Sequence, residues 1–319
     1  MSVLVYTENW DGIFKKLSFE LVSYAAKVAE MLGTSVTAVS IGNVSDDELN
    51  KLGTFGASKV LKVDGNATLD NQVYTSILAQ AAKAEGAKVV IISNNNTGKA
   101  VAPRLSVKLK AAIGAGLIKL PVSVDPFIVS KKVFSGKAFA NVVLKTDVKI
   151  LTLAQNSFEV IEKGGTATIE NFSADVSAAK TVVKDVKKQT GKILLNDAEI
   201  VVSGGRGMKS ADNWSAIEEL AEVLGAATAC SRPVSDEGWR PHDEHTGQTG
   251  KIIAPNLYIA AGISGAIQHM AGISSSKCIV AINNDADAPV FENADYGIVG
   301  DALKVLPALT QAIKEAKNK

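Results

Sequence analysis

Residues 257–272 read Leu257-Tyr258-Ile259-Ala260-Ala261-Gly262-Ile263-Ser264-Gly265-Ala266-Ile267-Gln268-His269-Met270-Ala271-Gly272. The apolar run that ends at Ala261 is typical of a buried strand. The glycines after it predict a turn, and the residues around Gln268 and His269 predict a helix. A glycine turn between a strand and a helix leaves backbone N–H groups free to bind phosphate or another anion. The stretch therefore predicts an α/β domain with an anion or nucleotide site where the strand ends.

Four more strand-like segments in this half of the chain lead into polar or glycine-containing loops. We expect them at residues 199–203, 226–230, 278–282 and 296–299, followed by loops at 204–207, 231–233, 283–285 and 300–301. Helical periodicity between them predicts a doubly wound α/β domain. In such a sheet the strand ends converge at one edge, and ligands bind there.

The first half of the chain shows the same alternation up to about residue 120. Strands are expected at residues 3–7, 36–41, 60–63 and 89–92, separated by amphipathic helices, one of which opens with the capping pattern Ser45-Asp46-Asp47-Glu48. This predicts a parallel sheet with helices on both faces. Residues 122–153 contain strand-like segments without helices between them, with turns at Gly136 and Asp147. We expect these segments, including Lys149–Leu153, to be added antiparallel strands that close the sheet.

The polar stretch 156–196 is the expected linker, with a domain boundary near residues 190–197. A chain of 319 residues fits two domains. We predict an N-terminal α/β domain at residues 1–193, which serves as scaffold and partner contact, and a C-terminal domain at residues 194–319, which holds the cofactor.

Composition limits the classes of function. Aromatic residues make up only 5% of the chain, and the net charge is +1, so nothing favours a nucleic acid or an anionic membrane as partner. No apolar run reaches the roughly 18 residues of a membrane helix, and residues 1–7 run directly into a strand without a leader pattern. We expect a cytoplasmic protein without membrane insertion.

Several residues could carry chemistry, and most have a simpler interpretation. Cys230 and Cys278 lack metal-ligand spacing and are expected to be buried free thiols. His242 and His245 flank two acidic residues, but no further metal ligand is evident, so no metal site is predicted. The turn Asn94–Gly98 follows a strand and is a second possible nucleotide site, although Asn-rich turns are common without ligands.

The predicted site has binding groups but no evident catalytic acid, base or nucleophile. Arg206 and Arg232 follow strand ends, where a guanidinium can pair with a pyrophosphate or with negative charge on a ring. The loop Gly247–Gly250 supplies an amide and a hydroxyl. Ser264 does not fit the pattern of a nucleophilic serine. These features favour a holder of a redox cofactor over a hydrolase, because such a cofactor brings its own reactivity.

Six segments of the second half resemble the alpha subunit of electron transfer flavoprotein, in the same order. They are residues 202–209, 230–233, 247–251, 257–272, 281–283 and 294–301. The first half resembles that family only in length and in its alternation of strands and helices. The resemblance implies an electron carrier, not an enzyme, that forms a heterodimer with a beta subunit and binds one FAD in the second domain. It also implies electron transfer from flavin dehydrogenases, such as the acyl-CoA dehydrogenases of fatty acid beta-oxidation, to a membrane quinone oxidoreductase.

The resemblance also implies which residues bind FAD: Arg206, Ser231, Arg232, His245, Thr246, Gly247, Gln248, Thr249, Ser264, Gly265, Ala266, Ile267, Gln268, His269, Asn283 and Asp301. Arg232 is expected near the isoalloxazine, Thr249 at the N5 side, and His269 as a donor to O2 of the ring. The segment from Ser264 to His269 is expected to hold the pyrophosphate and ribityl region, with Asn283 and Asp301 at the adenosine half. Cations beside N1 and C2=O stabilise a reduced, anionic flavin.

Two other functions stay open at this level. The chain could be the alpha subunit of an electron-bifurcating complex that oxidises NADH, which needs a second flavin from the partner. It could also be a nucleotide-binding or regulatory subunit without redox chemistry. Any nucleotide that the beta subunit holds is not encoded in this chain.

Overall fold

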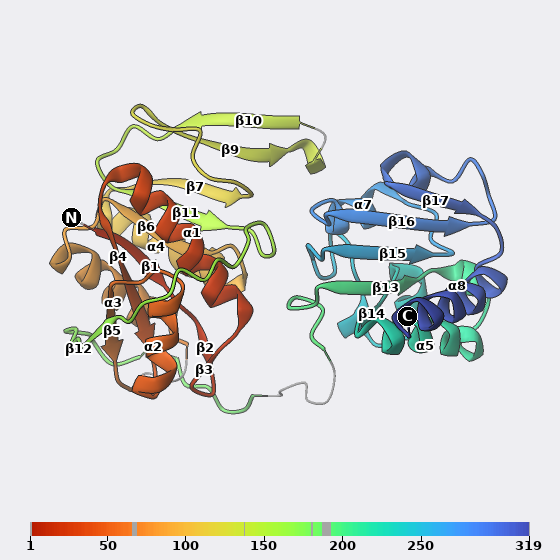
Figure 1. Ribbon diagram of the computed structural model, residues 1–319, viewed down its shortest axis with the longest axis horizontal. Helices are drawn as coiled ribbons and strands as arrows, with labels where there is room; N and C mark the ends of the chain where they lie inside the picture. The colour runs from red at the N-terminus through yellow and green to blue at the C-terminus, as the bar shows by residue number, and fades with distance from the viewer. Residues whose placement is uncertain (1, 66–68, 137, 180, 187–192, 319) are drawn as a thin grey trace. The chain divides into compact units, whose positions relative to one another are not determined.

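The structure is a computed structural model that describes residues 2–65, 69–136, 138–179, 181–186 and 193–318. The chain divides into two compact units, Met1–Lys187 and Lys188–Lys319, and each has its own sheet (Figure 1).

The first unit is built on one large, mainly parallel sheet. Its strands are β1 (Ser2–Tyr6), β4 (Ser35–Ile41), β5 (Lys59–Val63), β6 (Val89–Ser93), β7 (Ala112–Leu117), β8 (Ser123–Val124), β9 (Phe127–Val133), β10 (Ala138–Val143), β11 (Lys149–Leu153) and β12 (Thr168–Asn171). Their order is β10-β9-β7-β11-β6-β1-β4-β5-β12, and β8 pairs with β9. A small hairpin of β2 (Asn9–Trp10) and β3 (Ile13–Phe14) lies outside this sheet.

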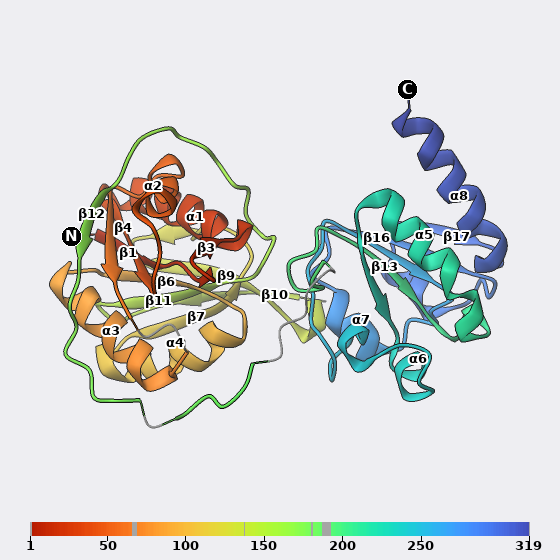
Figure 2. The same ribbon diagram turned by 90° about the horizontal axis from the view of Figure 1, so that it is seen from below.

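Helices cover both faces of this sheet, as predicted. They are α1 (Lys16–Leu32), α2 (Asp46–Thr54), α3 (Asn71–Ala84) and α4 (Asn96–Leu109). One apolar core contains side chains of α1 and α2, and the other contains side chains of α3 and α4 (Figure 2). The Ser45 hydroxyl accepts a hydrogen bond from Glu48 N at 3.3 Å, so this capping prediction is confirmed.

The prediction for residues 122–153 is partly wrong. Strands β9 and β10 form the expected antiparallel pair, joined by the 3-10 turn Phe134–Gly136. Strand β11, however, lies inside the sheet and runs parallel to both β6 and β7. Its run from Ile150 to Leu153 is buried, as in the central strands of a parallel sheet. The strand β7 was missed because its sequence Ala112–Leu117 is rich in alanine and glycine, which have low strand propensity.

Most of the predicted linker belongs to the first unit. We call residues 154–176 the strap, because they run along α1 and then, as β12, pair with the edge strand β5. The Glu20 carboxylate accepts hydrogen bonds from three backbone N–H groups of the strap, at residues 156, 157 and 158, over 2.8–3.0 Å. Burial raises the pKa of Glu20, and these donors oppose that shift.

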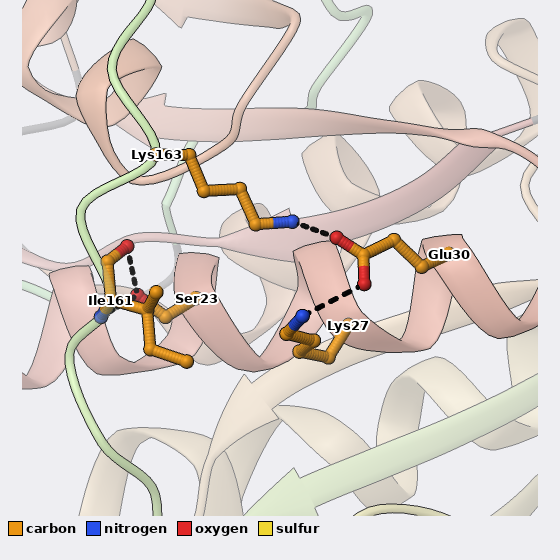
Figure 3. Close-up of polar contacts among 5 residues, drawn as sticks. All are labelled: Ser23, Lys27, Glu30, Ile161 and Lys163. Carbon is orange, nitrogen blue, oxygen red and sulfur yellow. Dashed lines mark hydrogen bonds and ion pairs between the residues drawn. The ribbon is translucent and has the colours of Figure 1, made fainter.

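Later turns of α1 also bind the strap (Figure 3). Ile161 N donates to the Ser23 hydroxyl at 3.0 Å, and Lys163 forms an ion pair with Glu30. The polar composition that suggested a linker therefore reflects a segment whose backbone is bound by polar side chains of a helix.

The second unit contains one five-stranded sheet that is parallel throughout. Its strands are β13 (Ile200–Gly204), β14 (Ala227–Cys230), β15 (Leu257–Ala261), β16 (Cys278–Asn283) and β17 (Tyr296–Val299), in the order β14-β13-β15-β16-β17. Helices α5 (Ser215–Leu224) and α8 (Ala302–Lys317) pack on one face, and α7 (Ile267–Ile273) packs on the other (Figure 2). The short helix α6 (Arg232–Asp236) follows β14. The predicted doubly wound fold is confirmed, and all five strands end at one edge.

Candidate functional site

The strand order of the second unit reverses direction between β13 and β15. The chain starts at β13, moves to β14 on one side, and then places β15, β16 and β17 on the other side. Loops that leave two such strands diverge, and the crevice between them is where open α/β sheets bind ligands. The glycine stretches after β13 and β15, which lie far apart in the sequence, therefore meet at this position.

Glycine is required where these two loops touch. Gly205 N donates to Ala261 O at 2.9 Å, and Gly207 N donates to Gly262 O at 3.0 Å. A Cβ atom on Gly205 would lie 2.2 Å from Gly262 O, so a larger residue would push the loops apart. The glycines thus bring two backbones close together at the edge of the sheet.

The loop after β15 offers backbone donors. Val290 N donates to Ser264 O at 3.0 Å, which fixes the turn, and Gly265 adopts a positive φ of 88°. Across the described residues, the N–H groups of residues 264–268 make no hydrogen bond to other protein groups. The side chains of Ser264, Ala266, Ile267 and Gln268 are exposed here. Consecutive N–H groups without acceptors form a concave site that fits an anion.

The loop Thr246–Gly250 lies beside the start of α7. Thr246 N donates to Cys230 O at 3.0 Å, and Gln248 N donates to Gln268 O at 2.7 Å, which ties the loop to both β14 and α7. Gly247 passes so close to α7 that a Cβ atom on Gly272 would lie 2.4 Å from Gly247 Cα. The side chains of Gln248 and Thr249 remain exposed, so the loop presents an amide and a hydroxyl at the same edge.

Sequence reasoning missed Arg240, which anchors the segment before this loop. Its Nε and Nη2 atoms each donate to a carboxylate oxygen of Glu244 at 2.7 Å, and Nη1 donates to Glu218 of α5 at 2.8 Å. The guanidinium also lies 5.6 Å from the centre of the Trp214 ring. Only 15% of the Arg240 side chain is exposed, so this bidentate pair is well shielded. The four-residue spacing of Arg240 and Glu244 was the available signal.

The cationic side chains lie where predicted, at the ends of β13 and β14. Arg206 is exposed, and no ion pair to it occurs among the described residues. Arg232 begins α6 and pairs loosely with exposed Asp236, at 3.2 Å. Ser231 is buried before it, with its backbone N–H donating to Gly204 O at 3.0 Å. His245 is also buried. Burial lowers its pKa, and the charge of Arg232 lowers it further.

Three buried side chains lie beneath the loop and α7. Nε2 of His269 is 2.9 Å from the Tyr258 hydroxyl, which is 3.4 Å from the Thr246 hydroxyl. Burial lowers the pKa of His269 to about 4, so its ring is neutral near pH 7. The Thr246 backbone opposes part of this shift, but Nδ1 has no hydrogen-bond partner of normal geometry among the described residues. Tyr258 was not predicted, since it stands within an apolar strand.

Asn283 and Asp301 have structural partners. Asn283 Nδ2 donates to Ile263 O at 2.9 Å, and its Oδ1 accepts from Asp285 N at 3.0 Å. Asp301 caps α8 by accepting from Leu303 N at 3.0 Å, and it pairs with Lys209 at 3.0 Å. The hydrogen bond from Lys209 lowers the pKa of Asp301. Contact of either side chain with a cofactor therefore stays a prediction.

The possible nucleotide site of the first unit is filled by the protein itself. It lies between β1 and β6, where that sheet reverses direction. The Glu8 carboxylate accepts from the Ser93 hydroxyl at 2.6 Å and from Asn95 Nδ2 at 2.8 Å. Asn95 caps α4, which begins at Asn96. The predicted turn at 94–98 is therefore wrong for residues 96–98, which belong to the helix. An anionic ligand at this position would meet the charge of Glu8.

The described parts of the chain contain neither a metal-binding cluster nor a membrane-spanning helix. No group of three or more His, Cys, Asp or Glu side chains there could hold a metal ion. His242 instead has its Nδ1 atom 2.9 Å from the Ser235 hydroxyl. None of the helices in the described residues has the length and apolar character needed to span a bilayer.

Comparison with known proteins gives matches in both units. Residues 3–177 match the family model described as electron transfer flavoprotein domain, and residues 194–274 match electron transfer flavoprotein FAD-binding domain. Several relatives carry the name electron transfer flavoprotein subunit alpha. The one from Syntrophomonas wolfei is 35% identical over 316 residues, which covers 98% of both chains. That from Bacillus subtilis is 35% identical over 98% of this chain and 97% of its own. The Mycobacterium leprae protein is 37% identical over 99% of both chains.

Proposed function

Because the chain belongs to the family of electron transfer flavoprotein alpha subunits, we propose that its second unit binds FAD and that the protein is an electron carrier rather than an enzyme. The observation that carries this proposal is the row of backbone N–H groups at residues 264–268, which have no acceptor among the described residues. Arg206, an exposed cation, follows the neighbouring strand β13. This combination fits the pyrophosphate of a dinucleotide.

The remaining groups fit the other parts of the cofactor. We assign Ser231, Arg232 and the segment from His245 to Thr249 to the flavin ring, since they surround the ends of β14 and α7. The segment Ser264–His269 is assigned to the pyrophosphate and ribityl chain. Asn283 ends β16 and Asp301 comes after β17, farther along the edge, and both are assigned to the adenosine half.

Charge at the site favours a negatively charged bound ring. Bound FAD supplies the redox chemistry, because the isoalloxazine can take up and release electrons. Arg232 is the cation assigned to the ring, and its guanidinium stabilises negative charge there. His269 is neutral, so it contributes a hydrogen bond and no charge.

The proposed route of electrons follows from the family. The alpha subunit pairs with a beta subunit, and the pair takes electrons from flavin dehydrogenases, including the acyl-CoA dehydrogenases of fatty acid beta-oxidation. It passes them to a membrane quinone oxidoreductase while remaining in the cytoplasm. The printed name "subunit alpha" of the relatives supports a second subunit.

Co-expression of this chain with a beta subunit of the family tests the proposal. The expected product is a yellow heterodimer with one FAD per alpha chain, measured by absorbance and by extraction of the flavin. The purified pair should be reduced by an acyl-CoA dehydrogenase and its substrate. A colourless complex would contradict FAD binding, whereas two flavins together with oxidation of NADH would identify a bifurcating complex instead.

A further inference from the structure

Tyr258 is not among the residues assigned to the cofactor, yet it makes a buried contact with two of them, His269 and Thr246. Its hydroxyl lies beneath α7, 2.9 Å from His269 Nε2 and 3.4 Å from Thr246 Oγ1. Tyr258 is fully buried, and only 7% of His269 is exposed. A tyrosine in a buried strand costs free energy unless its O–H has a partner, so this contact is a requirement of the fold.

The two possible proton arrangements differ in which ring nitrogen carries the hydrogen. In one, the Tyr258 O–H donates to Nε2, and the ring proton sits on Nδ1. In the other, Nε2–H donates to the phenol oxygen, and the phenol proton goes to Thr246. The tautomer of a histidine is set by such a neighbour.

The distances favour donation by Tyr258. A separation of 2.9 Å to Nε2 is normal for a hydrogen bond, whereas 3.4 Å to the Thr246 hydroxyl is at the outer limit. The Thr246 hydroxyl donates to the Cys230 carbonyl at 3.3 Å, so it can meet the phenol only as an acceptor, at the longer of the two distances. The Ser203 hydroxyl lowers the pKa of Tyr258, as a donor to the phenol oxygen does, but it forms no hydrogen bond of normal geometry with the described residues, so its contact with Tyr258 is weaker than that of His269.

We propose that Tyr258 is a positioning residue for His269: its O–H donates to Nε2 and holds the single proton of the neutral ring on Nδ1. This inference rests on the proposed FAD site and deepens it. Nδ1–H becomes the only donor of His269. The Thr246 backbone raises the pKa of the ring but offers no hydrogen bond of normal geometry, so Nδ1–H has no such acceptor among the described residues. A buried donor without an acceptor is unfavourable, and a carbonyl oxygen of the bound flavin ring, such as O2, would recover that cost.

This arrangement separates two tasks within the site. His269 orients the ring through one directional hydrogen bond, while the positive charge comes from Arg232 and Arg206. Loss of Tyr258 would therefore weaken orientation and leave the charge in place. Substitution Tyr258→Phe removes the O–H and little else, because the ring stays in its buried position.

The tautomer can be measured directly by nitrogen NMR of the full-length protein, with its beta subunit, before and after removal of FAD. The chain has only three histidines, and the signals of His269 are assigned by loss in His269→Gln. The expected spectrum shows a neutral ring with the proton on Nδ1. In Tyr258→Phe the proton should redistribute toward Nε2, and the dissociation constant of FAD should rise about tenfold. Tyr24→Phe, which removes another buried hydroxyl in the first unit, should change neither quantity.

A second variant distinguishes the two proton arrangements. Thr246→Val removes the hydroxyl but keeps the shape, so it should leave the tautomer of His269 unchanged if Tyr258 donates to Nε2. A change of tautomer in Thr246→Val, a proton on Nε2 in the parent protein, or a cationic ring would overturn the proposal. The spectrum of the FAD-free protein gives this answer even if FAD fails to bind, so failure of the proposed function is detected separately.

Discussion

Each of the two sheets has a crevice at its edge where a ligand could bind, and the two crevices are lined by groups of opposite charge. Each sheet has a point where successive parallel strands are added on opposite sides, between β1 and β6 in the first unit and between β13 and β15 in the second. In the first unit, the Glu8 carboxylate occupies this position and binds Ser93 and Asn95. In the second, the corresponding edge carries Arg206, exposed polar side chains and backbone donors that find no acceptor within the described parts of the chain.

This comparison shows that topology supplies a position for a ligand and side chains decide its use. At the start of α4, the Asn95 side chain caps the helix and donates to the Glu8 carboxylate, so the position is filled from within the chain. At the second position, no carboxylate of the described residues accepts from the row of N–H groups. Substitutions at each position test this difference.

Substitution Gly205→Ala should break the second position. The new Cβ atom would lie 2.2 Å from Gly262 O, so the two loops must separate, at a cost of about 1–3 kcal/mol. We expect the affinity for FAD to fall by more than tenfold, as measured by flavin retention and titration. Gly225→Ala is the control, since its Cβ atom meets no neighbour within 4 Å. It should lower the stability and leave the affinity unchanged. Equal FAD binding in both variants would contradict the assigned position of the loops.

Substitution Glu8→Ala should destabilise the first unit without changing the binding of FAD in the second. It leaves the buried Ser93 hydroxyl and the Asn95 amide without their acceptor, and such losses cost about 1–3 kcal/mol each. The midpoint of thermal unfolding should fall, while FAD content per chain stays constant. Glu30→Ala, which removes an exposed acceptor on α1, should have a smaller effect. If Glu8→Ala loses FAD and Glu30→Ala does not, Glu8 contributes to the binding of FAD, and the predicted difference between the two units is wrong.

Substitution Arg232→Ala should lower both the flavin reduction potential and the affinity for FAD, the latter by about tenfold, since a charged hydrogen bond contributes roughly 1.5–3 kcal/mol. A potentiometric titration measures the first quantity. The matched variant Asp236→Asn keeps the cation and removes its neighbour. It should not lower the potential. An unchanged potential in Arg232→Ala would show that the ring lies away from this residue.

The smallest effect concerns the pH dependence of stability at Asp301. Lys209 and the cap of α8 hold the pKa of Asp301 below its ordinary value. Its contribution to stability is therefore complete above the ordinary carboxyl pKa and is lost as the pH falls through the lowered value. Thermal unfolding in acid should depend less on pH in Asp301→Asn than in the parent chain. Lys209→Met should show a similar change, because it removes the main cause of the shift. If both variants keep the parent's dependence on pH, other carboxyl groups account for it.

Much of the second unit could be predicted from the sequence, because its signals are local. Apolar runs followed by glycine or polar loops marked every strand, and parallel pairing then brings all strand ends to one edge. The first unit was harder to predict. Strand β11 follows an antiparallel pair of strands in the sequence, yet it pairs in parallel with β6 and β7, which come earlier in the chain. Such pairing depends on burial between β6 and β7, which periodicity along the chain does not encode.

The two α/β units, the glycine-rich loops of the second unit and the residue types that fit a dinucleotide follow from the amino-acid sequence alone. These features depend on short-range propensity and on spacing along one strand or helix. Which polar groups bind other protein groups, and which are left for a ligand, is known only from the folded chain. Glu8 reaches Asn95 across 87 positions of sequence, and Tyr258 reaches His269 from a neighbouring strand. A hydrogen bond depends on distance and direction in space, so its presence becomes known only when the chain is folded.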